Sequence, residues 1–208
     1  MTDPGTGTHA PAADRLLLDA ARTGDVDGVR DALRAGARVE ARDEELRSPL
    51  LLASLGSHVE AARLLVAAGA DPDAQDRRED SAWLVTGVTG SVAMMRVLLP
   101  AHPDLTLTNR FGGISVIPAS ERGHVGYVRA VLAETDIDVN HVNRLGWTAL
   151  LEAVILGDGG RPHQEVVELL LAAGAVPDLA DQDGTTPLEH AERRGFDVIT
   201  ALLRKAQA

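Results

Sequence analysis

Cysteine is absent from the 208-residue chain, which excludes disulfides and thiol chemistry and leaves the redox compartment open. Aromatic residues make up only 2% of the sequence, and Ala, Leu and Val carry most of an apolar content of 45%. This composition suits closely packed helices better than a β-sandwich. The chain is long enough to bury a core within one domain.

Positive charge is also scarce. The net charge is −11, lysine is almost missing, and the arginines are not gathered in runs. A general nucleic-acid binder needs a basic face, so we expect no DNA or RNA partner. No apolar run approaches the roughly 20 residues of a membrane span. The chain starts with MTDPGTGTHAPAAD, which lacks the basic and apolar regions of a signal peptide. We therefore expect a cytoplasmic protein without a membrane partner, and the arginine-rich, lysine-poor composition favours a bacterial source.

What the sequence does contain is a repeat. Five Asp or Asn residues each follow an apolar, helix-like segment, with spacings of 33, 33, 34 and 38 residues: Asp43, Asp76, Asn109, Asn143 and Asp181. A short helix pattern, a Gly-His-like break and a second helix pattern follow each of them. The fourth position of each turn, where Gly would supply a positive φ, holds Leu46, Glu79, Gly112, Gly146 and Gly184.

A unit of about 33 residues with a helix, a turn, a helix and a hairpin tip resembles the ankyrin repeat. The closest local matches are GTTPLEHA at 184–191, GHVGYVRAVL at 123–132 and HQEVVELLLAAGA at 163–175. The resemblance implies an all-α solenoid of about six helix-turn-helix repeats, starting near residues 14, 43, 76, 109, 143 and 181. Residues 13–208 would form a single ankyrin-repeat domain, because a helix pair buries its apolar stripe only by stacking on its neighbours. Residues 1–12 are predicted to be a disordered tail.

Departures from the repeat pattern predict local structure. Asp14 is predicted to cap the first helix, and Ser115, which replaces the usual Pro, is predicted to cap a helix that starts one residue late. Pro118 would then be the third helical residue, where its missing N–H costs little. Repeat 5 carries five extra residues, Asp158 to Pro162, which are predicted to form an exposed loop.

Candidate catalytic chemistry is sparse. No H-E-x-x-H, P-loop or G-x-S-x-G motif is present. His58, His124 and His163 occupy the break between two helices, where a His is ordinary in ankyrin repeats. Glu152 and His190 share one offset in repeats 5 and 6 and are predicted to form a charge-assisted pair. We therefore expect no enzymatic activity, no cofactor and no bound metal.

Ankyrin repeats usually hold partners with the hairpin tips and the exposed side of the first helix. Mapping those offsets gives these candidate protein-binding residues in repeats 3 to 5: Arg77, Arg78, Arg110, Phe111, Glu121, Arg144, Leu145, Trp147 and Ile155. Arg77, Arg110 and Arg144 occupy one offset in successive repeats and would form a short ladder. Phe111 and Trp147 lie on the same face. Arginines and aromatics beside apolar groups are typical of interface hot spots.

Other interpretations of these residues stay open. Each arginine of the ladder could merely pair with a neighbouring Asp or with Glu121. Trp147 could pack over the backbone of Gly113 in the preceding repeat.

The sequence thus predicts a monomeric interaction module that binds an acidic and apolar segment of another protein on the concave face of repeats 3–5. The alternative is a small-ligand receptor or an enzyme with a pocket in the groove around Glu121. A narrow pocket that encloses Glu121 would favour the alternative, whereas an open concave strip would favour a protein partner.

Overall fold

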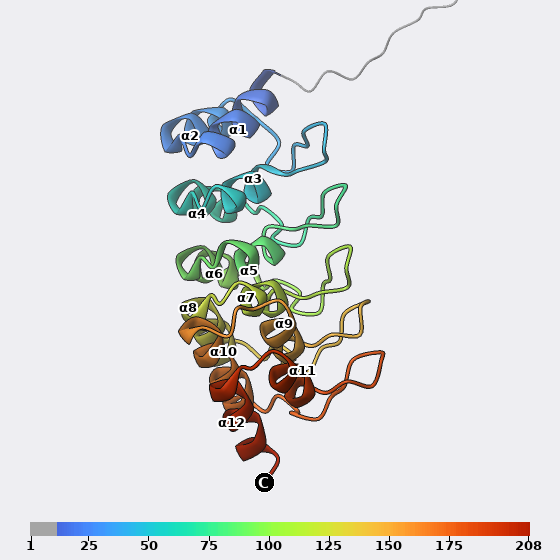
Figure 1. Ribbon diagram of the computed structural model, residues 1–208. Helices are drawn as coiled ribbons and strands as arrows, with labels where there is room; N and C mark the ends of the chain where they lie inside the picture. Colours follow the sequence, from blue (N-terminus) through green and yellow to red (C-terminus); the bar gives the residue numbers. More distant parts are fainter. Residues whose placement is uncertain (1–11) are drawn as a thin grey trace, which may run out of the picture.

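The computed structural model describes residues 12–208, and in this part of the chain all regular structure is helical (Figure 1). The helices form six consecutive pairs. The first helices of the pairs are α1 (Ala12–Thr23), α3 (Pro49–Leu55), α5 (Leu84–Thr89), α7 (Val116–Glu121), α9 (Ala149–Ile155) and α11 (Pro187–Arg193). The second helices are α2 (Val26–Arg34), α4 (Val59–Ala67), α6 (Val92–Leu98), α8 (Val125–Glu134), α10 (Arg161–Ala172) and α12 (Asp197–Ala206), and the 3₁₀-helix η1 (Leu99–Ala101) extends α6.

The pairs stack into a solenoid, which confirms the predicted fold. Figure 1 shows the second helices in one column and the first helices in another, with hairpin tips projecting beyond the first helices. The predicted disordered tail falls on residues 1–11, which lie outside the described residues, and on Ala12, which already belongs to α1.

The core is a continuous strip between the two columns of helices. Five second helices each place a fully buried residue at the matching position: Leu65, Leu98, Val131, Leu170 and Leu203. A single helix pair would leave this apolar surface exposed, so each repeat depends on its neighbours for stability.

One side-chain oxygen closes each hairpin tip of repeats 2 to 6. The Oδ1 atom of the tip Asp or Asn accepts the backbone N–H groups of the residues two and four positions further on, at 2.7–3.0 Å. The turn forces a positive φ on the fourth residue: 61° at Leu46, 60° at Glu79, 73° at Gly112, 77° at Gly146 and 76° at Gly184. The first two tips therefore hold strained, non-glycine residues in the left-handed region.

Three histidines at the start of the second helices join neighbouring repeats. Their Nε2 atoms hydrogen-bond main-chain carbonyls of the preceding repeat, in the pairs His58–Arg22 (3.1 Å), His124–Val88 (3.2 Å) and His163–Glu121 (2.9 Å). These rings bridge repeats, which is a structural use of the side chain.

The predicted N-cap at Asp14 is wrong. The helix already begins at Ala12, and the Asp14 side chain is only 1% exposed. Its carboxylate accepts the backbone N–H and the Nε–H of Arg38, both at 2.7 Å, and these contacts help to lower the pKa of Asp14 against the opposing effect of burial. Asp14 therefore ties α1 to the segment that leaves α2.

The segment from Ile114 onward also differs from the prediction. The helix α7 does begin at Val116 with Pro118 as its third residue, but the Ser115 hydroxyl makes no capping bond and Ser115 has helical backbone angles. A turn comes first, since the Ile117 N–H already donates to the Ile114 carbonyl at 3.0 Å. The Ser115 carbonyl lies so close to Gly87 that a Cβ on Gly87 would sit 1.8 Å from its oxygen. The close approach of α5 and α7 thus depends on glycine.

The five-residue insert of repeat 5 is partly loop and partly helix. Asp158 is exposed as predicted, but Arg161 and Pro162 form the start of α10, so the prediction of a loop is wrong for these two residues. The Asp158 carboxylate accepts the Gly160 N–H and binds His163 Nδ1, both at 2.8 Å. These two contacts hold the pKa of Asp158 below its ordinary value and tie the loop to the first turn of α10, whose N-cap residue is Gly160.

The strain at the tips is testable. Leu46→Gly is expected to raise the free energy of unfolding by about 1 kcal/mol, because a left-handed residue with a Cβ is strained by roughly this amount. The matched change is Gly184→Ala, at the same position of repeat 6, where a Cβ would meet nothing within 4 Å. It should lower the stability by about 1 kcal/mol through backbone strain alone. Urea unfolding curves measure the free energy of unfolding of both variants. A lower value for Leu46→Gly than for the wild type would contradict strain at this tip.

Candidate binding groove

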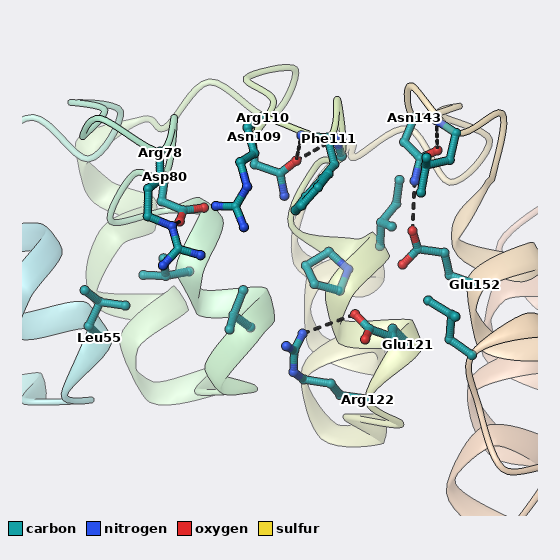
Figure 2. A pocket seen from close by; sticks show the side chains of 17 residues that line it. Leu55, Arg78, Asp80, Asn109, Arg110, Phe111, Glu121, Arg122, Asn143 and Glu152 are labelled. Atoms are coloured by element: carbon teal, nitrogen blue, oxygen red, sulfur yellow. Dashed lines mark hydrogen bonds and ion pairs between the residues drawn. The ribbon is translucent and has the colours of Figure 1, made fainter.

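A groove of about 430 Å³ runs along repeats 2 to 5, between the first helices and the hairpin tips (Figure 2). The first helices and the residues directly after them contribute Leu55, Val85, Val88, Ile117, Pro118, Glu121, Arg122, Glu152 and Leu156. The hairpin tips contribute Arg78, Asp80, Asn109, Arg110, Phe111, Gly113, Asn143 and Leu145. Five of the predicted binding residues therefore meet here: Arg78, Arg110, Phe111, Glu121 and Leu145.

Apolar side chains are unusually exposed in the groove. Leu55, Phe111, Leu145 and Leu156 are 44–50% exposed, and they account for four of the nine large hydrophobic residues that are exposed among residues 12–208. They come from three repeats, yet all line one groove. A gathering of this kind on a folded surface makes the groove a candidate binding site.

The predicted arginine ladder is not one continuous feature. Arg77 donates from Nε to the Glu44 carbonyl at 2.9 Å, and Arg144 donates from NH1 to the Arg110 carbonyl at 2.7 Å. Arg144 also lies 3.8 Å from the Glu79 carboxylate. Both side chains thus tie their tip to the preceding tips, and neither lines the groove.

Arg110 behaves differently. Its guanidinium group lies over the Phe111 ring, 4.4 Å from the centroid, and Figure 2 shows it directed into the groove toward Asp80. Asp80 itself is 3.9 Å from Arg78. Burial raises the pKa of Asp80 and so does the charge of Asp76, whereas Arg78 and Arg110 oppose the rise. No carboxylate of the described residues lies within 4 Å of Arg110, so its charge stays available to a ligand.

Glu152 is the most buried of the acidic residues that line the groove. It projects from α9, is only 7% exposed, and accepts a hydrogen bond from Asn143 Nδ2 at 2.8 Å through Oε1 (Figure 2). Burial raises the pKa of Glu152 to about 7, and the negative charge of Glu121 adds to the effect. The Asn143 hydrogen bond and the charge of Arg122 oppose the rise but do not cancel it.

The predicted pair between Glu152 and His190 is wrong. His190 Nε2 binds Asp181 Oδ2 at 2.7 Å, within its own repeat. The reason lies in the tip turn: in repeats 5 and 6 the second side-chain atom of the tip residue engages the residue nine positions further on, in the first helix of the same repeat. Asn143 offers an amide N–H there and pairs with a carboxylate, whereas Asp181 offers an oxygen and pairs with a histidine. In repeat 2 the Asp43 Oδ2 atom accepts from Arg22 and Arg47 instead.

Two other predicted site residues lie beside the groove without lining it. Trp147 and Ile155 are both half-buried. The side chains nearest to the position that a Gly113 Cβ would take belong to Asn109 and Ile117 rather than to Trp147. Sequence reasoning missed the role of Asn143 and Glu152 in the groove. The sequence does carry a signal for this contact, since the tip residue Asn143 is followed nine residues later by the acid Glu152.

Comparisons with known proteins agree with this architecture. The family profile described as ankyrin repeats (3 copies) matches residues 82–181 and 119–208, and the ankyrin repeat profile matches residues 45–77. The chain belongs to the ankyrin repeat family. Repeats of this family are generally protein–protein interaction modules. No helix among residues 12–208 has the length and apolar character needed to cross a bilayer.

Similar proteins cover nearly the whole chain. The ankyrin repeat protein YahD of Escherichia coli (strain K12) is 43% identical over 196 residues, which are 94% of this chain and 96% of YahD. The crystal structure of an ankyrin repeat domain from Acinetobacter baumannii AYE is 46% identical with a TM-score of 0.87, and the match covers 92% of this chain and 97% of that domain. The ankyrin repeat domain of Bcl-3, a member of the IkappaB protein family, is 25% identical with a TM-score of 0.81 and covers 93% of this chain and 86% of that domain.

The buried carboxyl predicts a pH-dependent stability. The folded-state pKa of Glu152, about 7, lies above the ordinary value of 4.5, so its favourable contribution is complete below pH 4.5 and is lost as the pH rises through 7. Glu152→Gln should therefore raise the free energy of unfolding at pH 8 by roughly 1–3 kcal/mol and leave it nearly unchanged at pH 5.

Urea unfolding at both pH values checks this expectation. Glu168→Gln, which removes the same charge from an exposed position on α10, is the matched control and should change little at either pH. An equal effect of Glu152→Gln at pH 5 and pH 8 would rule out the raised pKa.

Proposed function

We propose that this protein is a non-enzymatic interaction module that holds a segment of another protein in the groove. The observation that carries the proposal is the meeting of four exposed large hydrophobic side chains with a stacked, unpaired arginine in one depression. Apolar contacts would supply most of the affinity, and Arg110 with Phe111 would act as the anchor.

The chemistry of the groove favours a partner segment that carries an apolar residue next to a carboxylate. A guanidinium group binds a carboxylate with two parallel hydrogen bonds, and the Phe111 ring already holds that of Arg110 in place. The proposal therefore reduces the predicted ladder to one recognition arginine, since Arg77 and Arg144 are engaged with main-chain carbonyls. Binding as a monomer in the cytoplasm remains a prediction.

A small-ligand receptor is the second candidate. The groove volume of about 430 Å³ falls within the usual range of small-molecule sites, and Glu121 lines it as the alternative requires. Against this candidate stands the length of the groove, which spans four repeats and suits an extended segment better than a compact molecule.

A photo-crosslinking experiment tests the proposal. Benzoylphenylalanine placed at position 111 is expected to crosslink a partner protein in living cells, because Phe111 is 49% exposed within the groove. The matched control places the same group at Val198, which is 50% exposed on α12 and away from the groove. The adduct should form at position 111 only.

Binding of the crosslinked protein is then measured with purified components. Arg110→Ala combined with Phe111→Ala should weaken the affinity by about tenfold or more. An unchanged affinity in this folded variant, or equal crosslinking at both positions, would refute binding in the groove.

A further inference from the structure

The floor of the groove holds two acids that lie on neighbouring helices. Glu121 comes from α7 and Glu152 from α9, two helices that pack directly on each other, and both side chains line the groove (Figure 2). Glu152 uses one oxygen for the Asn143 amide, whereas no described residue donates a hydrogen bond to its Oε2. The residue as a whole is only 7% exposed, so burial removes much of the water that a free carboxyl would bind.

The charges in the groove do not pair completely. Arg78 lies 3.9 Å from Asp80, and Arg122 lies 3.3 Å from Glu121. Glu152 has no arginine, lysine or histidine within 4 Å among the described residues. A buried carboxylate without a cation is costly, and removal of that cost would favour a ligand that brings a positive charge.

The surroundings of Glu152 suit a long side chain with a charged end. Leu145 and Leu156 are half-exposed and line the same groove, and the buried Ile117 and Pro118 add apolar surface to its lining. Lysine and arginine both place an aliphatic stem along apolar surface while the charged head reaches a polar group.

We propose that the groove receives a basic side chain, lysine or arginine, of the partner segment, with its stem against Leu145 and Leu156 and its head at Glu152 and Glu121. This inference rests on the proposed function and adds the anchor that the partner must carry. The segment would then combine a basic residue for the floor with a carboxylate for Arg110.

The proposal predicts a dependence on pH. A cation at the floor stabilises the ionised carboxyl, so binding is linked to proton release by Glu152 and should strengthen between pH 5.5 and pH 8. The other charged groups that act on Glu152 are Glu121 on α7 and Arg122 directly after it. Arg194, directly after α11, donates to the carbonyls of Ile155 and Gly157 at the end of α9. The nearby rings belong to His163 on α10, which binds Asp158 and the Glu121 carbonyl, and to His190 on α11, which binds Asp181.

Capped five-residue peptides test the inference directly. The probe is acetyl-Ala-Leu-Arg-Leu-Ala-amide, and its neutral counterpart carries citrulline, which has the shape of arginine without the charge. A lysine peptide completes the set. Titrations followed by the amide NMR signals of Glu121, Asn143 and Glu152 give the dissociation constants at pH 8 and pH 5.5.

At pH 8 the arginine and lysine peptides should bind at least about fivefold more tightly than the citrulline peptide. The preference should fall below about twofold at pH 5.5 and in Glu152→Gln at pH 8. Glu168→Gln, with the same loss of charge on an exposed face of α10, should keep it.

Three results would overturn the inference. These are equal binding of the arginine and citrulline peptides, an unchanged preference in Glu152→Gln, and no shift of the groove signals at millimolar peptide. If free n-butylguanidinium bound as tightly as the arginine peptide, the site would belong to a small organic cation instead. None of these results touches crosslinking at position 111, so the proposed function would survive a failure of the basic anchor.

Discussion

The architecture depends on one acceptor atom at each hairpin tip. A single Asp or Asn oxygen accepts hydrogen bonds from two backbone N–H groups of the turn. These two bonds fix the turn that precedes the first helix of the same repeat. The turn needs a left-handed residue at its fourth position, and the chain accepts strain at Leu46 and Glu79 to keep it. The repeat can therefore carry extra residues outside the tip, as in the insert from Asp158 to Pro162.

The second side-chain atom of the tip residue links the fold to the groove. In repeats 5 and 6 it contacts the residue nine positions later, where an Asn at the tip donates to an acid and an Asp at the tip pairs with a histidine. Asp181 accepts from His190, and Asn143 donates to Glu152. In repeats 2 to 4 the same position is apolar, with Leu52, Val85 and Pro118. Among repeats 2 to 5, repeat 5 alone thus has a carboxyl at this position, where burial raises its pKa.

Much of the fold and part of the groove could be predicted from the sequence, because local chemistry determines them. The spacing of the tip residues and the apolar periodicity of the helices predict the solenoid, and offsets within the repeat predict Arg110, Phe111 and Leu145 in the groove. Contacts between distant residues escaped prediction. Asp14 looks like a cap until Arg38, twenty-four residues later, is seen to occupy its carboxylate. Equal offsets also do not fix side-chain torsions, which is why Arg77 turns to a carbonyl while Arg110 stacks on Phe111.

The central claim is that Glu152 is a buried carboxyl whose charge the protein compensates only in part. A carbon-13 NMR titration of the Glu152 side-chain carboxyl measures this directly. The account predicts a midpoint near pH 7 in the wild type, and a lower midpoint in Glu121→Gln, because the charge of Glu121 contributes to the rise. A wild-type midpoint near the ordinary value of 4.5, unaffected by Glu121→Gln, would contradict it.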